Sequence, residues 1–391
     1  MSAFRTFLKT EVQGAWALLG QVVSSFTPVS PGQAQFDSVA HKGLLVPDLA
    51  PWWETGGFLA TASPIMSLLQ SLLHLTNFKN PLLRTLIPAV SAAYAIQAAF
   101  AVPSIVAQNE RFYDFSGSLT YLSVTALSLY LPSLRAKYSS AVASSAPLPG
   151  LFEAFTKPGG VGALNWRQVV ISGAVAFWAV RLGSYLFQRI LEEGKDSRFD
   201  EIKKSPAKFA GAWFAQATWV SLCLMPVIAL NSVPAAAFAS LPAFKITDAI
   251  GLFVYVAGFA FEITADRQKS KWLREKRAKA HDEEFMTKGL WSVSQYPNYF
   301  GEMSLWTGIA TAAAGVLVTQ PIQLALGLSS GVTGPLTAMA MSYVSPAFVS
   351  FLLLKVSGVP MSEKKYDKRY GDRKDYQEWK KNTPKLFPKI F

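Results

Sequence analysis

The sequence is poor in cysteine, in histidine and in charge, and each shortage argues against a class of protein. Its 391 residues contain one cysteine, Cys223, which rules out an internal disulfide framework and a cysteine-ligated zinc site. The three histidines are too scattered to form the His-x-x-x-His pair of a zinc hydrolase, so no metal site is expected. Charged residues make up 16% of the chain, against roughly 25% in an average soluble domain. So much apolar surface cannot fit inside one soluble core, and the composition is typical of a polytopic membrane protein.

Apolar runs long enough to cross a bilayer, about 20 residues each, recur along the chain. We place them at 58–76, 83–107, 117–134, 166–191, 209–230, 246–265, 299–318 and 334–354. All are expected to be helices, because unpaired backbone cannot face lipid and no run shows the alternation of a barrel strand. The expected fold is an all-α polytopic membrane helix bundle with about eight transmembrane helices, within a range of seven to nine. Residues 1–57 are expected to form an N-terminal non-membrane segment.

Lysine and arginine concentrate in three segments, at 189–208, at 267–288 and after residue 354. The second segment carries eight Lys or Arg, and the third carries eleven against five Asp or Glu. Such residues collect on the cytosolic side of a membrane, and two expected spans separate each successive pair of segments. We therefore expect an integral membrane protein with all three segments, and the C-terminus, in the cytosol. The start of the sequence lacks the pattern of a cleavable signal peptide.

Ionisable residues in the second half of the chain stand at helical spacing inside or beside the expected spans. Arg181, Tyr185 and Arg189 follow i, i+4 and i+8, and Glu262 and Asp266 form another i, i+4 pair. An ionisable group in a membrane is costly and is by default a functional hypothesis. Each group also has an alternative interpretation without a function. Arg181 would pair with a buried carboxylate that serves only packing. Glu262 and Asp266 would be solvated at the end of their helix. The helix is expected to continue into the basic segment 268–280, which suits anionic lipid headgroups or a phosphate-bearing cofactor.

The stretch from Gly289 to Glu302 is the most informative part of the sequence. A helix is expected to begin at or just after Pro297, because the residue before a proline avoids the helical conformation. Asn298, Glu302 and Trp306 then stack on one face, as an amide, a carboxylate and an indole entering a membrane. These groups suit the amide or the ribose of a nucleotide. The alternative is a capped helix whose glutamate pairs with a lysine.

These motifs resemble those of the steroid 5-alpha-reductase superfamily. The resemblance rests on Gly-Leu-Trp at 289–291, Pro-Asn-Tyr-Phe-Gly-Glu at 297–302 and Trp-x-Gly at 306–308. The chain is more similar to the branch of that superfamily known as domain of unknown function 1295. Other stretches that agree with this branch are 111–118, 178–183, 194–200, 266–269 and the tail 370–388. The resemblance covers roughly residues 80–385.

The resemblance implies a membrane-embedded NADPH-dependent reductase of a hydrophobic, sterol-like or lipid-like enone or C=C bond. The helices of 58–245 would admit the substrate from the bilayer, and 246–391 would hold NADPH at the cytosolic side. The expected cofactor-binding residues are Asn298, Tyr299, Glu302, Trp306, Asp266, Lys269, Arg274, Arg181 and Tyr376. Tyr113, Tyr121 and Tyr185 are the candidates for the catalytic proton donor. The expected partners are this substrate and membrane lipids, with no nucleic acid, and the expected membrane is the endoplasmic reticulum.

Two other functions remain open from the sequence. The first is an S-adenosylmethionine-dependent methyltransferase of the isoprenylcysteine carboxyl methyltransferase type, whose Glu, Tyr-Gly and Tyr in the tail are loosely matched here. Gln295 and Tyr296 stand where that group has Arg-His before its Pro-x-Tyr, and a methyl donor without phosphates would not need so many cations. The second is a non-catalytic membrane scaffold that kept the fold, because a fold alone does not establish a function.

Overall fold

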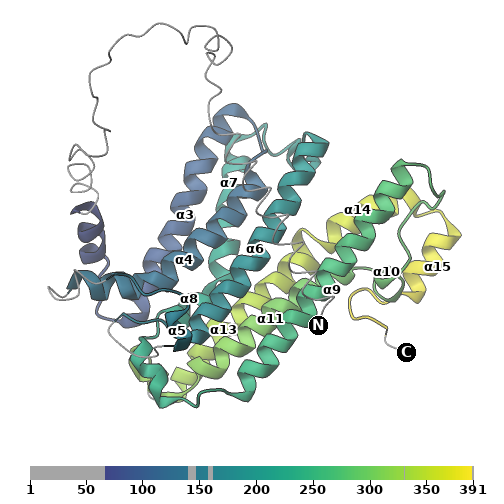
Figure 1. Cartoon of the computed structure of the whole chain (residues 1–391). Coiled ribbons are helices and arrows are strands. Elements are labelled where there is room, and N and C mark those ends of the chain that lie inside the picture. The colour runs from purple at the N-terminus through teal and green to yellow at the C-terminus, as the bar shows by residue number, and fades with distance from the viewer. Residues whose placement is uncertain (1–66, 140–146, 157–161, 330, 390–391) are drawn as a thin grey trace, which may run out of the picture.

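The computed structural model describes residues 67–139, 147–156, 162–329 and 331–389, and every regular element in them is a helix (Figure 1). The prediction of an all-α protein is therefore confirmed for this part of the chain. The predicted non-membrane segment 1–57 and most of the predicted span 58–76 lie outside the described residues. Residues 67–75 form a short helix.

Long helices make up most of the structure. They are α3 (Pro81–Ala107), α4 (Tyr113–Ser139), α6 (Trp166–Glu193), α7 (Pro206–Cys223) with α8 (Met225–Asn231), α9 (Ile246–Arg277), α11 (Pro297–Leu317) and α13 (Thr333–Phe351). Shorter elements connect or follow them: α5 (Glu153–Thr156), η2 (Ser197–Phe199), η3 (Ala235–Ser240), α10 (Leu290–Val293), α12 (Gln320–Ala325), η4 (Leu352–Val356), α14 (Val359–Tyr370) and α15 (Lys374–Asn382).

Four helical stretches are long and apolar enough to cross a membrane: α3, α6, α9 and the stretch Thr333–Tyr370 that begins with α13. The pair α7 and α8, which is bent by 51°, adds a fifth if it forms one span. The predicted spans 117–134 and 299–318 fall in α4 and α11, which have 27 and 21 residues but do not meet the same criterion of hydropathy and charge. By length and composition, the described residues thus contain four or five candidate spans, fewer than the eight expected.

The composition of α11 has a physical reason. This helix lies between α9 and α13 and buries 13 of its 21 residues, many of them Gly or Ala. A helix that faces protein on most sides packs through small residues instead of the large apolar side chains that face lipid.

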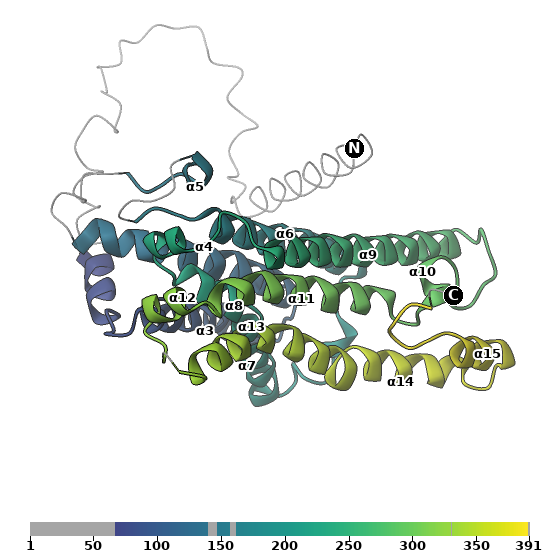
Figure 2. The same cartoon turned by 90° about the horizontal axis from the view of Figure 1, so that it is seen from below.

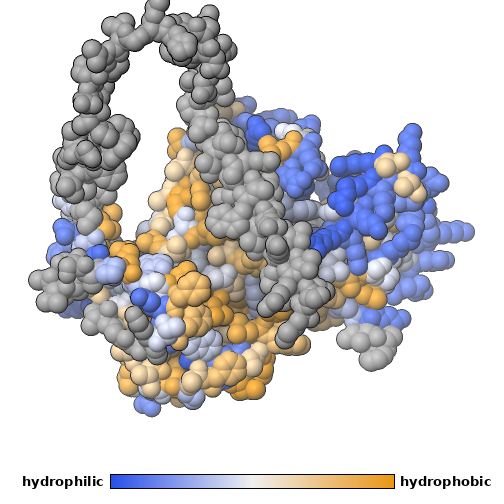
Figure 3. Space-filling view, in the orientation of Figure 1, coloured by the Kyte–Doolittle hydropathy of each residue, from blue (hydrophilic) through white to orange (hydrophobic). Residues whose placement is uncertain are grey.

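The bundle has three layers (Figure 2). One layer holds α4, α6 and α9, the next holds α3, α8 and α11, and the third holds α7 and α13. Successive long helices run in opposite directions, so their connections gather at two ends. We call the end formed by residues 108–112, 194–205, 278–296 and 357–389 the basic end, and the end formed by 67–80, 162–165, 232–245 and 318–329 the opposite end. The surface of the bundle is largely hydrophobic, whereas the region of α14 and α15 is hydrophilic (Figure 3).

The helices α9 and α11 approach each other backbone to backbone. Regularly spaced glycines permit this contact, and they are Gly251 and Gly258 on α9, and Gly301, Gly308 and Gly315 on α11. A Cβ atom at Gly258 would lie 2.7 Å from the backbone nitrogen of Leu305, and one at Gly301 would lie 2.6 Å from that of Glu262. Real side chains do not fit at such distances. The glycines therefore set the register of α11 against the part of α9 that carries Glu262.

Candidate functional site

A guanidinium bridges two carboxylates near the basic end. Arg181 of α6 donates to Glu262 at 2.6 Å and to Asp266 at 2.5 Å, and both acids belong to α9. The three side chains are only 10%, 5% and 14% exposed. The i, i+4 spacing of the acids places them one turn apart, so one arginine reaches both. This contact fits the interpretation of Arg181 as the partner of buried carboxylates.

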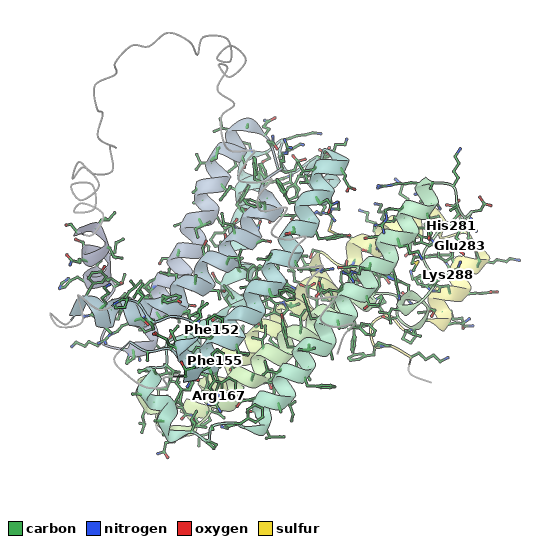
Figure 4. All side chains as sticks on the ribbon, viewed as in Figure 1. Phe152, Phe155, Arg167, His281, Glu283 and Lys288 are labelled. Atoms are coloured by element: carbon green, nitrogen blue, oxygen red, sulfur yellow. The ribbon has the colours of Figure 1, made fainter. Side chains whose placement is uncertain are left out.

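A second buried ion pair joins the same two helices at the opposite end. Arg167 donates through Nε and Nη2 to both carboxylate oxygens of Asp248, and the two side chains are 4% and 3% exposed. Figure 4 shows Arg167 at the far end of the molecule from His281, Glu283 and Lys288. Arg167 and Asp248 are 81 residues apart in the sequence, and Arg181 and Glu262 are also 81 residues apart.

The equal spacing means that α6 and α9 run side by side in the same direction. The two ion pairs are about 21 Å apart along these helices. Sequence reasoning missed Arg167 and Asp248. The signal that was available is the matching interval of two arginines and two acids in neighbouring apolar segments.

The start of α11 completes a polar cluster around Arg181. The helix begins at Pro297, as predicted, and carries half-buried Asn298 and Glu302. Glu302 lies within electrostatic range of Asp266 and Arg181, yet no lysine or arginine of the described residues is within ion-pair distance of it. The interpretation of Glu302 as the partner of a lysine is therefore not met there. The polar cluster, defined as Arg181, Glu262, Asp266, Asn298 and Glu302, holds three carboxylates and one cation.

Two buried oxygen atoms of the polar cluster have no hydrogen-bond partner among the described residues. They are Oδ1 of Asn298 and Oε2 of Glu262. A buried acceptor without a partner costs about 1–3 kcal/mol. Such atoms mark a place where a ligand or water with hydrogen-bond donors would bind favourably.

Trp306 lies one turn further along α11, inside an aromatic cluster that also contains Tyr121, Trp178 and Trp219. The Trp306 ring centroid is 5.0 Å from that of Trp178 and 5.9 Å from that of Tyr121. The indole nitrogens of Trp178 and Trp306 and the hydroxyl of Tyr121 are buried and have no hydrogen-bond partner in the described part of the chain. The Tyr121 hydroxyl neighbours the thiol of Cys223, and Glu302 is within electrostatic range of both. The structure thus places Tyr121 of α4 beside Trp306 of α11, although the two residues are far apart in the sequence.

The other two candidate tyrosines lie elsewhere. Tyr113 donates its hydroxyl to the carbonyl of Ala212 at 2.9 Å and packs against Phe199 and Trp213 in a separate hydrophobic cluster. Tyr185 lies one turn beyond Arg181 on α6, with the guanidinium carbon 5.6 Å from its ring centroid, and it is 38% exposed. Of the three candidates, only Tyr121 lies in the aromatic cluster.

The predicted basic residues Lys269 and Arg274 lie on the half of α9 that reaches the basic end. Lys269 lies over the ring of Trp291, 4.6 Å from the centroid, and no carboxylate of the described residues is within ion-pair distance of it. Asp266, one turn earlier on α9, and Lys365 of α14 both lie within electrostatic range of Lys269. The Gly-Leu-Trp motif positions this indole, because Trp291 donates to the carbonyl of Ala265. Arg274 is exposed on the last turns of α9.

The tail packs against the start of α11. Tyr376 is buried, and its hydroxyl donates to Asp367 at 2.8 Å. Gln295 donates to the carbonyls of Lys380 and Thr383, and Tyr296 stacks on Tyr299 with ring centroids 5.4 Å apart. The two residues that replace the Arg-His pair of the methyltransferase group thus anchor α15 and support Tyr299.

Two motifs from the N-terminal half meet in an ion-pair network at the basic end. Arg198 donates to Asp114 and Asp196, which joins the stretch 111–118 to the stretch 194–200. Glu110 accepts hydrogen bonds from Lys203 and from the backbone of Asp196. Burial raises the pKa of the Glu110 and Asp196 carboxyls, but the hydrogen bonds from Lys203 and Arg198 outweigh it and lower both pKa values.

A further carboxylate outside the membrane-length helices is held in the same way. The hydrogen bond from Lys288, followed by that from Trp272, lowers the pKa of Glu283.

Within the described residues, no group of three or more His, Cys, Asp or Glu side chains is arranged to hold a metal ion. The chemistry available at the site is therefore that of acids, cations and hydrogen-bonding aromatic groups.

Comparison with known proteins gives one match. The model of a family described as "Protein of unknown function (DUF1295)" matches residues 151–383, which is more than half of the chain. No curated protein and no solved structure matches the chain. The matched region contains the polar cluster, Lys269, Lys365 and the tail as far as Thr383, and it begins after the helices α3 and α4. The chain therefore belongs to the DUF1295 family, which is part of the steroid 5-alpha-reductase-like membrane family.

Proposed function

We propose that this membrane protein is an NADPH-dependent reductase of a hydrophobic, sterol-like or lipid-like enone or C=C bond. The observation that carries the proposal is the neighbourhood of two features at the basic end. One is the polar cluster with its unpartnered buried acceptors, and the other is the pair of cations Lys269 and Lys365, of which Lys269 has no carboxylate of the described residues in ion-pair contact. A ligand that fits both must have hydrogen-bond donors at one end and negative charge at the other.

NADPH has this distribution of groups. The phosphates would be held by Lys269 and Lys365, because phosphates are bound by cations and are repelled by the three carboxylates of the polar cluster. The nicotinamide amide and the ribose hydroxyls would be held by Asn298 and Glu302, beside the unpartnered acceptors Oδ1 of Asn298 and Oε2 of Glu262. The cofactor supplies a hydride to the substrate when it is bound. The residues of the chain then have to orient it and exclude water.

The aromatic cluster supports a substrate side next to the cofactor residues. Tyr121 has a buried hydroxyl with no hydrogen-bond partner among the described residues, and it adjoins Trp306 on α11. A tyrosine in this position can hold a proton and donate it to the oxygen of an enone. We therefore favour Tyr121 over Tyr113 and Tyr185 as the proton donor.

The same proposal includes the membrane arrangement. The seven long helical segments α3, α4, α6, α7 with α8, α9, α11 and α13, together with the predicted span 58–76, make eight spans. The basic end would face the cytosol, since it collects Lys and Arg, and the membrane would be that of the endoplasmic reticulum. Substrate would then reach the aromatic cluster from the bilayer, while NADPH would bind from the cytosol.

The first test is ligand-dependent stability. The full-length protein in detergent is heated with NADPH, NADH or S-adenosylmethionine, because a ligand that binds the native state raises the Tm by mass action. We expect NADPH to raise the Tm and NADH to have little effect. Asn298→Ala and Glu302→Ala are each expected to weaken NADPH affinity at least tenfold, about 1.4 kcal/mol. Lys269→Met is expected to reduce the preference for NADPH over NADH.

Lys271→Met is the matched control, because Lys271 is on the same helix but 71% exposed and paired with Glu275. Its affinity for NADPH should equal that of the wild type. A shift with S-adenosylmethionine alone would replace the proposal by a methyltransferase. If none of the three ligands raises the Tm, the non-catalytic membrane scaffold becomes the favoured function. Once NADPH binding is established, oxidation of NADPH in the presence of sterol enones tests the reaction itself.

A further inference from the structure

A large cavity lies at the opposite end of the bundle, away from the polar cluster. Its volume is about 1330 Å³, more than the roughly 300–1,000 Å³ of pockets for drug-sized ligands. Residues of the short helix 67–75, the start of α3, the end of α4, the start of α6 and the segment after α8 form its walls. Many of these residues are Leu, Ala, Pro or Val, which suits hydrocarbon.

The charged residues of the described lining are all basic. They are Arg84 and Arg135, and the described lining has no aspartate or glutamate. Neither arginine is within ion-pair distance of a carboxylate in the described residues, and their positive charges repel each other. Unpaired cations beside apolar walls are costly inside a membrane protein, so such residues mark functional positions.

The two arginines are differently occupied. Arg135 donates to the carbonyls of Leu73, Thr76 and Arg84, so it connects the helix 67–75 to α3 and α4. Its Nε is buried without a partner among the described residues. Arg84 donates through Nε to the carbonyl of Phe78, and the structure shows no acceptor among the described residues for its two Nη groups. The Arg84 fork is thus available for an anionic group.

The surroundings of the cavity are suited to lipid. Leu72 and Leu75 of the helix 67–75 are 49% and 77% exposed, and Phe152 beside α5 is 86% exposed. Figure 4 shows Phe152 and Phe155 at the same end as Arg167, whose neighbour Gln168 lines the cavity. Large exposed apolar side chains at this end indicate contact with hydrocarbon instead of water.

We propose that this cavity binds one anionic lipid, with its negative head group at Arg84 and Arg135 and its hydrocarbon chain along the apolar walls. The complementarity is one of charge and of shape together: neither a neutral lipid nor a free anion satisfies both. This lipid site is separate from the reductase site, because the cavity and the polar cluster lie at opposite ends of the helices. Its function is to complete the packing between the helix 67–75, α3 and α4.

The test uses the purified full-length protein in a neutral detergent. Lipids are identified by mass spectrometry after extraction, and the Tm is measured after addition of phosphatidylglycerol, palmitate, phosphatidylcholine, methyl palmitate or inorganic phosphate. We expect an anionic lipid to copurify and the anionic amphiphiles to raise the Tm. Phosphatidylcholine, methyl palmitate and inorganic phosphate should not. A larger effect of phosphatidylglycerol than of palmitate would identify a phosphate head group, and the reverse order would identify a carboxylate.

Two variants change the cavity in different ways. Arg84→Gln keeps a donor for the Phe78 carbonyl but removes the positive charge, and should weaken binding of the anionic amphiphiles at least tenfold. Ala235→Trp fills the cavity from η3 without changing charge, and should abolish binding of any lipid. Arg111→Gln is the matched control at the basic end, and should bind like the wild type. Equal stabilisation by neutral and anionic lipids, or unchanged binding in both cavity variants, would overturn the proposal. NADPH binding should be unaffected throughout.

Discussion

Replacing Arg181 by methionine should destabilise the protein strongly, because it leaves two buried carboxylates without their counter-charge. Arg181, Glu262 and Asp266 are 10%, 5% and 14% exposed, with donor–acceptor distances of 2.6 and 2.5 Å. Exposed ion pairs contribute about 0–1 kcal/mol, whereas removing one partner of a buried pair costs about 3–5 kcal/mol. The low exposure places this triad in the second group. At roughly 2–4 °C per kcal/mol, the apparent Tm should fall by on the order of 10 °C.

The assay is thermal unfolding of purified variants in detergent, followed by tryptophan fluorescence, with SDS titration as an independent measure. Arg189→Met is the matched control on the same helix, because Arg189 is 37% exposed and lies 3.5 and 3.6 Å from its acidic partners. The free energy of unfolding should fall by no more than about 1 kcal/mol in Arg189→Met. A rescue is also expected. Combining Arg181→Met with Glu262→Gln and Asp266→Asn removes the unpaired charges and should restore most of the lost stability.

Two results would contradict this account of the triad. The first is a loss in Arg181→Met no larger than that in Arg189→Met, which would mean that the carboxylates are solvated. The second is a triple variant that is less stable than Arg181→Met alone. In that case the carboxylates would have partners other than Arg181, and the polar cluster as described would be wrong.

Two further predictions concern the fold. Gly308→Leu should prevent α9 and α11 from packing together, because a side chain at Gly308 would collide with the backbone of Tyr255. The free energy of unfolding should fall by more than about 4 kcal/mol. Gly173→Leu is the control, since nothing lies within 4 Å of a Cβ added at Gly173. Size-exclusion chromatography should show a monodisperse peak only for the control, and two equal profiles would contradict the close helix contact. Glu110→Gln should lower the free energy of unfolding by about 1.5–3 kcal/mol at neutral pH, because it removes the carboxylate that accepts from Lys203 Nζ and from the backbone N–H of Asp196. The folded protein lowers the pKa of Glu110 below its ordinary 4.5. The stability that the Glu110 carboxylate contributes is therefore present above pH 4.5, and it is lost as the pH falls through the pKa of Glu110 in the folded protein. Tm measured from pH 7 to pH 3 should therefore converge for wild type and Glu110→Gln, and a constant difference would exclude the ion pair as the cause.

Several local features of the fold could be predicted from the sequence. The predicted runs 83–107 and 166–191 agree closely with α3 at Pro81–Ala107 and α6 at Trp166–Glu193. The predicted helix start at Pro297 is also confirmed. Helix ends and apolar segments depend on neighbouring residues, through the proline ring, the capping side chains and the hydropathy of a continuous run. Such properties can be determined without knowledge of the rest of the chain.

The number of membrane spans does not follow from helix boundaries and hydropathy alone. Hydropathy measures how well a helix suits lipid, so it identifies helices at the surface of the bundle better than those inside it. The helix α11 faces protein and is built from small residues, and it does not meet the criterion that α3, α6 and α9 meet. The regular glycine repeat of α9 and α11 was the available sign that these two helices pack on each other.

The order of the amino acids is enough to establish an all-helical membrane protein of the steroid 5-alpha-reductase-like family, with most of its helix boundaries and a set of ionisable residues in apolar surroundings. Which of these residues meet depends on the tertiary structure. Arg181 contacts acids that are 81 and 85 residues away, Tyr121 adjoins Trp306, and Lys269 lies over Trp291. This difference arises because a helix of known sequence still has an undetermined rotation and register against its neighbours. Contacts between glycine backbones and buried ion pairs between different helices set both, and neither can be read from one segment alone.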